Sequence, residues 1–281
     1  MRPVIRLTAA AGGLLLAGSL AACGSSPTVS VTSVSAGATR PSSAASSEAA
    51  SSQATAAPTA KTVVHQARSS AATATSAHLH AVIAVETGDE TVDLKGTMDG
   101  SNQELTITYP REGTATVRTV DGKYYIKGDR TFWRTAAAAD ATSAARIAGK
   151  WVQTPAETAR RLNGLTLRSF IDELIGPQTI SESDLEQATT TRSSGGSTPA
   201  WLVDSGQGDT LKVSADSAHH LLEAAGPTDG GRGTATIDGW DSQPRITAPA
   251  GAITLPGVGG GGGGGSGKGG SDTSTEDGRT T

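Results

Sequence analysis

Apolar and polar residues alternate between residues 79 and 109, and this alternation limits the fold more than any other feature of the sequence. Successive side chains of a strand point to opposite faces, so strands with this pattern have one apolar and one polar face. Asp121-Gly122 is a strong hairpin signal between two further apolar runs, at 117–120 and 124–126. The pattern predicts an antiparallel sheet that is covered on one side only.

The middle of the chain supplies helices for that cover. Spacing near 3.6 residues predicts a helix over 59–75, an alanine-rich run predicts a second over 135–148, and a stripe of apolar residues ahead of Gly176-Pro177 predicts a third. Further strands are expected near 186–192, 201–204, 210–213, 219–224 and 233–238. The predicted fold class is α+β, a broad antiparallel sheet with helices on its dry face.

Two low-complexity segments bound this region. Residues 24–58 consist mainly of Ser, Ala and Thr, and residues 259–265 are consecutive glycines. Neither has enough large apolar surface to offset the entropy of an ordered chain. We therefore expect a disordered tether over 23–58, one folded domain over 59–257 and a disordered Gly-rich tail over 258–281. With a net charge of −4 and no basic run, the chain does not suit nucleic acid.

The single cysteine, Cys23, lies at the end of a short secretory signal. Arg2 and Arg6 precede an uncharged apolar stretch over 7–20, which is too short to span a bilayer. Leu20-Ala21-Ala22-Cys23 resembles the bacterial lipobox, which implies that residues 1–22 are removed and that Cys23 is acylated, for example with palmitate. Two or more acyl chains hold a protein stably on a membrane. The alternative is an ordinary secreted protein with a chance cysteine near its cleavage site.

The glycine-rich tail contains an incomplete match to a phosphate-binding loop. Gly262 to Gly269 reads GGGGSGKG, which matches a phosphate-binding loop up to Lys268 but has Gly269 where the Mg²⁺-binding Ser or Thr belongs. A strand before the loop and a helix after it are also required. We expect no nucleotide and no other cofactor.

Several motifs in this order resemble one family. They are the lipobox, the Ser/Ala tether, "SAHLHAVIAVE", "VDGKYYIKGDRTFW", "GKWVQTP", "LRSFIDELIG", "AWLVDSGQGDTLKVSAD" and "WDSQPRITAPAGAITLPG". The chain resembles the actinobacterial LppX/LprG-type lipoproteins, which have the LolA-like fold. The resemblance implies a strongly curved half-barrel sheet with helices on its concave face. It also implies a space for the acyl chains of lipids or glycolipids between sheet and helices. Asp216-Ser217-Ala218 departs from the family's Gly-x-Pro turn.

The predicted inward face is aliphatic, with small members such as Gly96 and Ala115. A pocket for acyl chains needs a wide dry lining of this kind, and so does an ordinary close-packed core. The candidate lining residues are Leu79, Ala81, Ile83, Val85, Val92, Leu94, Leu105, Ile107, Val117, Leu167, Phe170, Ile171 and Leu174. Trp133 and Trp151 are expected to pack where helices meet the sheet.

The sequence offers little for catalysis or metal binding. His78 and His80 would share a strand face, but no third ligand is positioned near them, and His219 and His220 would face opposite ways in a strand. The serines of the folded region lie outside the Gly-x-Ser-x-Gly context of a nucleophile elbow. We expect that the protein is not an enzyme and that it has no metal site.

Two hypotheses follow. In the first, a membrane-anchored lipoprotein on the outer face of the cytoplasmic membrane binds a lipid or other amphiphile as a carrier or chaperone. In the second, a closed domain acts through its surface on a protein partner, in assembly or signalling at the cell envelope. A continuous apolar cavity of several hundred Å³, on the order of known ligand pockets, would favour the first hypothesis. Scattered voids would favour the second.

Overall fold

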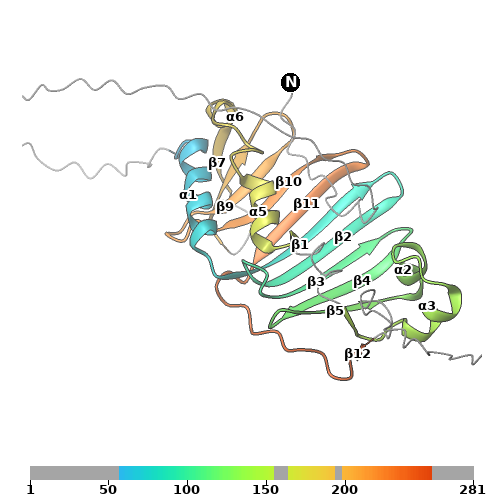
Figure 1. Ribbon diagram of the computed structural model, residues 1–281. Coiled ribbons are helices and arrows are strands. Elements are labelled where there is room, and N and C mark those ends of the chain that lie inside the picture. Colours follow the sequence, from blue (N-terminus) through green and yellow to red (C-terminus); the bar gives the residue numbers. More distant parts are fainter. Residues whose placement is uncertain (1–56, 155–163, 194–197, 255–281) are drawn as a thin grey trace, which may run out of the picture. The chain divides into compact units, whose positions relative to one another are not determined.

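The computed structural model describes residues 57–154, 164–193 and 198–254 (Figure 1). In this part of the chain twelve strands form one mixed, unclosed sheet, accompanied by five helices. The predicted α+β class is confirmed. The predicted sheet was antiparallel throughout, whereas this sheet contains one parallel pair of strands. The predicted signal sequence and lipidation site, most of the tether and the glycine-rich tail lie outside the described residues.

The folded part of the chain divides into two compact units. Unit 1 comprises the described residues up to Ala74, together with 80–90 and 171–238, and unit 2 comprises 75–79, 91–170 and the described residues from Gly239 onward. Three elements have residues in both units: β1 (Ser76–Val85), β2 (Gly88–Thr97) and α5 (Leu167–Ile175).

Unit 1 is a helix layer on antiparallel strands. Its strand order is β11-β10-β9-β8-β7, and α1 packs on β8, β9 and α6 (Figure 1). The elements are α1 (Ala60–Thr73), α6 (Glu182–Gln187), β7 (Thr189–Ser193), β8 (Ala200–Asp204), β9 (Thr210–Ser214), β10 (Leu221–Thr228) and β11 (Gly231–Asp238).

Helix α1 forms where its spacing predicts a helix. The hydroxyl of Thr59 accepts a hydrogen bond from the amide of Thr62 at 3.2 Å, which satisfies a first-turn donor. The buried residues recur at three- and four-residue intervals and so form one stripe. They are Ala60, Val63, Val64, Ala67 and Ala71. This stripe is the face that α1 presents to the strands and to α6.

The predicted strand over 186–192 is wrong in its first half, because α6 ends at Gln187 and β7 begins only at Thr189. A capping box starts α6: the Ser181 hydroxyl accepts from the amide of Asp184, and the Asp184 carboxylate accepts from the amide of Ser181. Ser-x-x-Asp is a weaker form of this signal than Ser-x-x-Glu. The local caps therefore set the bounds of this short helix ahead of β7.

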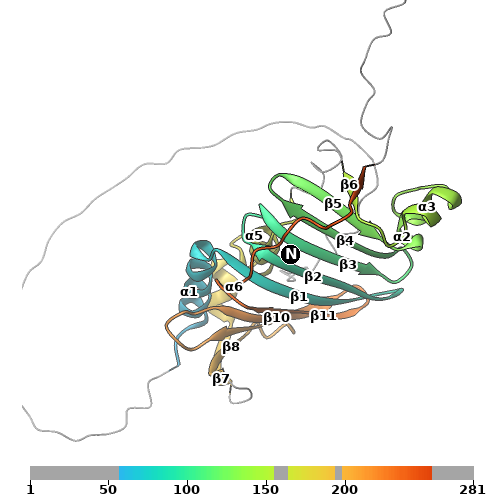
Figure 2. The same cartoon turned by 90° about the horizontal axis from the view of Figure 1, so that it is seen from below.

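Unit 2 is the larger group of strands, with two short helices. Its strand order is β12-β6-β5-β4-β3-β2, antiparallel except for β12, which runs parallel to β6. Helix α2 packs on β4, β5 and α3 (Figure 2). The remaining elements are β3 (Asn102–Tyr109), β4 (Gly113–Val120), β5 (Lys123–Gly128), α2 (Arg130–Thr135), α3 (Ala141–Ile147), β6 (Val152–Thr154) and β12 (Ile253–Thr254).

One row of aliphatic side chains crosses the whole strand set of unit 2. Each member is the direct cross-strand partner of the next, so the apolar face predicted from the alternation is continuous from β2 to β12. In order across the strands, the row is Leu94, Leu105, Val117, Ile126, Val152 and Ile253. The polar face is equally regular, with Glu104 opposite both Lys95 and Arg118.

The helix predicted over 135–148 is confirmed in its second half, where α3 ends at Ile147 just before Gly149, and is wrong in its first half, because α2 already ends at Thr135. Asp129 starts α2 earlier than predicted, because its carboxylate accepts from the amide of Phe132 at 2.7 Å. Ala138 has a positive φ of 52°, which ends helical geometry before α3. Asp140 then restarts the helix by accepting from the amides of Thr142 and Ser143.

Two sequence expectations about small and turn residues have clear outcomes. The Asp121-Gly122 hairpin is confirmed, since both residues have positive φ, 50° and 71°, as a two-residue hairpin of this type requires. Gly96 was expected as a small residue in the lining of a cavity, but the structure gives another reason for glycine at this position. A Cβ there would lie 2.2 Å from the carbonyl oxygen of Asn102. Gly96 therefore permits close approach of backbone to backbone.

Candidate ligand-binding site

The residues predicted to line a cavity lie in the apolar interior. Ten of the thirteen are buried, and Val85, Ile107 and Phe170 are half-buried. The register of unit 2 brings one group of them together on a single face: Val92, Leu94, Leu105, Ile107 and Val117. Burial agrees with a lining and equally with a packed core, so their role as ligand contacts stays a prediction.

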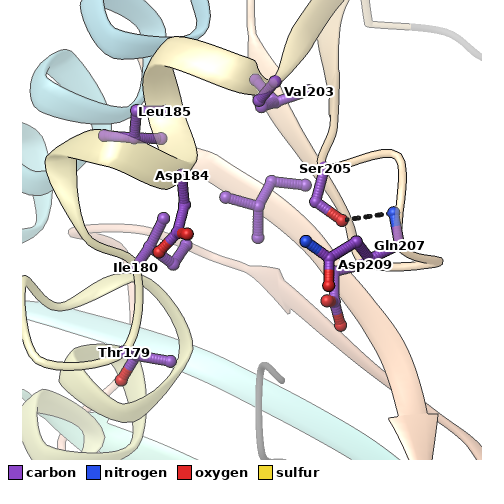
Figure 3. A pocket seen from close by; sticks show the side chains of 10 residues that line it. Thr179, Ile180, Asp184, Leu185, Val203, Ser205, Gln207 and Asp209 are labelled. Atoms are coloured by element: carbon purple, nitrogen blue, oxygen red, sulfur yellow. Dashed lines mark hydrogen bonds between the residues drawn. The ribbon is translucent and has the colours of Figure 1, made fainter. Parts of the chain in front are cut away.

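A small apolar pocket lies in unit 1, where α6 and the segment before it face strands β8 and β9 (Figure 3). Its apolar lining comes from Ile180 and Leu185 on the helix side and from Val203 and Leu211 on the strands. Polar residues stand around these, and one of them, Ser205, accepts from the amide of Gln207 at 3.1 Å. The cavity measures about 40 Å³.

This pocket was missed by the sequence reasoning, which chose none of its residues. Val203 and Leu211 lie in strands that were predicted, at 201–204 and 210–213, and their alternation identifies them as inward-facing. Ile180 and Leu185 fell outside any predicted helix. The capping pattern at Ser181 is the signal that would have placed Leu185 on the buried side of α6.

Charged side chains join α6 to α1 at the surface of unit 1. Glu182 at the start of α6 meets Lys61 at 2.9 Å, His65 at 2.8 Å and Arg68 at 3.5 Å, all from α1. Lys61, His65 and Glu182 are each about half exposed, with 49% of the side chain accessible. Hydrogen bonds from Lys61 and then from His65 lower the pKa of Glu182 from 4.5 to about 2.

Arg68 has a second role at the end of α5. Its Nε donates to the carbonyl of Ile175 at 2.6 Å, and its Nη2 donates to the carbonyl of Ile180 at 2.7 Å. Carbonyls at a helix C-terminus lack partners within the helix and carry partial negative charge, so a cation is favoured there. Arg68 therefore ties α1 to the chain that leads into α6.

The histidines take part in pairwise contacts. His78 Nε2 lies 3.1 Å from the Asp93 carboxylate in unit 2. His220 Nδ1 in unit 1 lies 2.8 Å from the hydroxyl of Ser70 on α1. The predicted strand over 219–224 is wrong at its start, because His219 has a positive φ of 50° and β10 begins at Leu221. Within the described ranges, no group of three or more His, Cys, Asp or Glu residues could hold a metal ion.

The Ser70–His220 pair resembles part of a hydrolase triad, so its surroundings bear on catalysis. A triad needs a carboxylate that orients the histidine. The nearby Asp216 accepts from the hydroxyl of Ser214 at 2.7 Å and from the amide of Ala218 at 3.1 Å, and it also interacts electrostatically with His220. These hydrogen bonds shape the turn at 216–218.

The tryptophans behave differently from each other. Trp133 packs as predicted, in an apolar cluster with Ala144, Ile147 and Val152. Trp151 does not join that cluster: Arg118 lies over its ring at 4.7 Å and Lys127 at 5.8 Å, a cation–π arrangement.

None of the helices in the described ranges has the length and hydropathy to span a bilayer.

Comparison with known proteins gives a likeness in fold. Neither protein-family models nor curated sequences gave a match. Among solved structures, LprF from Mycobacterium bovis is 16% identical, with a TM-score of 0.43 over 70% of this chain and 100% of LprF. The Mycobacterium tuberculosis lipoprotein LppX is 12% identical, with a TM-score of 0.37 over 67% of this chain and 98% of LppX.

Proposed function

We propose that the protein is a membrane-anchored lipoprotein of the cell envelope that binds the acyl chain of a lipid or other amphiphile, as a carrier or chaperone and without catalysis. The observation that carries this proposal is the apolar pocket of unit 1 between α6 and strands β8 and β9. Its facing walls, Ile180 and Leu185 against Val203 and Leu211, offer aliphatic contact, and the carboxylates of Asp184 and Asp209 also belong to the lining. Each CH₂ buried on such a surface contributes about 0.8 kcal/mol.

The pocket needs to widen for this role. Its volume of about 40 Å³ is close to the share of a single water molecule in the liquid. An acyl chain therefore enters beyond its tip only if α6 moves away from the strands. The proposal is accordingly one of induced opening, in which the ligand replaces the contacts that α6 gives up.

Helix α6 is built to move at modest cost. It is six residues long, and Leu185 is its buried residue. Its attachment to α1 runs through Glu182, whose pairs with Lys61 and His65 are half exposed, and through Arg68, which also donates to the carbonyl of Ile180. Such pairs re-form easily in water, so displacement of α6 sacrifices few apolar contacts.

The binding test uses the full lipidated chain. Native mass spectrometry after expression in a lipid-rich host should show mass beyond the acylated polypeptide, and a fluorescent fatty acid should bind. Val203→Phe adds a ring to the pocket and should weaken uptake at least fivefold. Leu202→Phe, on the other face of β8, is the matched control and should not. Overpacking costs about 1–3 kcal/mol, so both variants are checked for folding by thermal melting.

Two outcomes would count against lipid binding. One is an acylated protein without extractable lipid and without uptake of the fatty acid. The other is equal uptake by the Val203→Phe and Leu202→Phe variants, which would place the ligand elsewhere.

The surface-acting alternative retains one specific support, the small size of the pocket. If α6 does not open, unit 1 is a closed layer and the protein acts through its exterior. Crosslinking in cells would then recover the same protein partner from the wild type and from Val203→Phe, while lipid stays absent from both.

Anchoring at the outer face of the cytoplasmic membrane is a separate part of the proposal and rests on the sequence around Cys23. Cys23→Ser should release the protein to the soluble fraction or leave an uncleaved precursor. A Cys23→Ser variant that stays membrane-bound and still incorporates labelled palmitate would show that the motif has been misread.

A further inference from the structure

A second pocket lies entirely within unit 2, at the end of its strands where the hairpin turns gather. It is lined by the 99–101 turn, by Gln103 on β3, by Thr119 on β4, by Gly122 and Tyr124 at the β4–β5 hairpin, and by Thr166 ahead of α5. Its volume is about 220 Å³. Its side chains carry one amide, four hydroxyls and one carboxylate, whereas the pocket of unit 1 includes aliphatic walls.

The side chain of Gln103 gives this pocket a buried acceptor. Gln103 is 4% exposed, and its Nε2 donates to the carbonyl of Leu165 at 2.8 Å. That bond fixes the orientation of the amide, so the other end presents Oε1. Within the described part of the chain, Oε1 has no hydrogen-bond partner. A buried acceptor without a partner costs about 1–3 kcal/mol, which a donor in the pocket would recover.

A glycine lies beside Oε1 at a position where a side chain would press against it. Gly100 has a φ of 74°, and a Cβ at this position would lie 2.9 Å from Gln103 Oε1 and 2.8 Å from the methyl carbon of Thr166. Gly122, at a φ of 71°, adds no side chain to the opposite rim. Glycine at both positions therefore preserves the space above the acceptor.

The charges of the lining decide which donor fits. The one ionisable carboxylate, Asp99, uses Oδ1 to accept from the hydroxyl of Thr97 and from the amide and hydroxyl of Ser101. Asp99 is exposed and already accepts hydrogen bonds within the 99–101 turn, so its negative charge does not require a bound cation. The lining has no lysine or arginine that would favour an anion. The remaining groups are hydroxyls, which both donate and accept.

We infer that this pocket is a binding site for a neutral polyhydroxyl group, a sugar ring, with Gln103 Oε1 accepting from one of its hydroxyls. Thr119 lines the pocket, is 5% exposed and adds a second hydrogen-bonding group to the wall. A volume of 220 Å³ equals about seven waters at their liquid density, which suits one ring rather than a long chain. The inference rests on unit 2 alone and is independent of acyl-chain binding in unit 1.

The test is an NMR titration of the ¹⁵N-labelled full chain, held in a zwitterionic detergent that contributes no sugar. Free glucose, galactose and mannose are added separately, and ethanolamine is added as a cationic probe. At least one sugar should shift the Gln103 side-chain amide and the backbone amides of Gly100 and Gly122. We expect a Kd on the order of 1 mM, as for a small ligand with few contacts.

Paired variants on β4 locate the site. Thr119→Val removes the hydroxyl inside the pocket while keeping the side-chain shape, and should weaken sugar binding at least fivefold. Thr116→Val removes a hydroxyl of the same strand that pairs with Thr106 on the other face, and should leave binding unchanged. Both changes keep a β-branched residue, so strand propensity is matched.

Three results would overturn the inference. The first is the absence of shifts with all three sugars at about 100 mM, two orders above the expected Kd, which would mean that the pocket holds water only. The second is an equal weakening of sugar binding by the two variants, and the third is a stronger shift with ethanolamine than with any sugar. Because free sugars carry no acyl chain, failure here leaves the lipid proposal standing, and failure of lipid binding leaves this site standing.

Discussion

Unit 1 and unit 2 attach their helices to strands by different means. In unit 2, Trp133 of α2 is 8% exposed and packs with residues of α3 and β6, and its ring meets Phe132 edge-on at 5.3 Å. In unit 1, α6 contributes one buried residue, Leu185, and is joined to α1 chiefly by the charges around Glu182. One attachment is aromatic and dry, and the other is largely ionic and wet.

The difference teaches where each unit can open. Truncation of a buried aromatic residue costs about 3–5 kcal/mol, whereas an exposed ion pair is worth about 0–1 kcal/mol. Ligand-binding segments come from the less stable parts of a fold. The α6 region of unit 1 is therefore the part in which a ligand can displace protein, while the α2–α3 cluster of unit 2 is fixed.

The largest effect should come from Trp133→Ala. We expect the free energy of unfolding to fall by about 3–5 kcal/mol, because the change leaves a cavity among Ala144, Ile147 and Val152. Urea denaturation followed by circular dichroism measures it. Trp151→Ala, which removes the ring beneath Arg118, is the control and should cost clearly less. Similar losses for the two tryptophans would erase the contrast drawn above.

Leu185→Ala should have the next largest effect, a loss of about 2–3 kcal/mol. This is the low end for leucine truncation, because the pocket beside Leu185 already deprives it of some contacts. The same variant should take up more fluorescent fatty acid than the wild type, since the space under α6 grows. A loss as large as that of Trp133→Ala, without a gain in uptake, would show that α6 is as firmly packed as α2.

Asn102→Asp should cost about 1–3 kcal/mol. The side chain of Asn102 is 8% exposed and both donates to and accepts from the backbone of Ile246, at 2.8 Å each. Aspartate puts an acceptor against the carbonyl of Ile246. Hydrogen exchange at the Ile246 amide, followed alongside urea denaturation, should accelerate.

The matched control for Asn102 is the exposed pair between Arg245 and Asp121, at 2.7 Å. Both side chains are about 70% exposed, so Arg245→Ala should change stability by less than about 0.5 kcal/mol. If the two changes were equivalent, the segment after Gly239 would be held by surface charge rather than by buried hydrogen bonds.

The smallest expected effect is the pH response of Glu182→Gln. The folded-state pKa of about 2 lies below the ordinary value of 4.5, so the ionised carboxylate stabilises the fold fully above about pH 4.5. That contribution is lost as the pH falls from 4.5 through about 2. Stability curves of wild type and variant should therefore converge at low pH. Curves that stay parallel across this range would mean that Glu182 does not link α1 to α6 in solution.

Local patterns in the sequence were sufficient for several elements. The stripe of α1 and the turn at Asp121-Gly122 involve residues within one or two turns of each other, and both are confirmed. The alternation of β3 and β4 likewise predicted a continuous apolar face. Where a capping residue sets the start of a short helix, as at Ser181 and Asp140, the sequence reasoning missed that start.

The sites were not predictable in the same way. Ile180 and Leu185 meet Val203 and Leu211 only because α6 packs beside β8 and β9. Gln103 presents a buried acceptor only because its side-chain amide donates a hydrogen bond to the carbonyl of Leu165, far along the chain. Alternation, spacing and capping act over a few residues, so the sequence by itself determined which segments form strands and helices and which faces are apolar. Whether those faces fill each other or leave room depends on contacts between distant residues, and only the tertiary structure decided that.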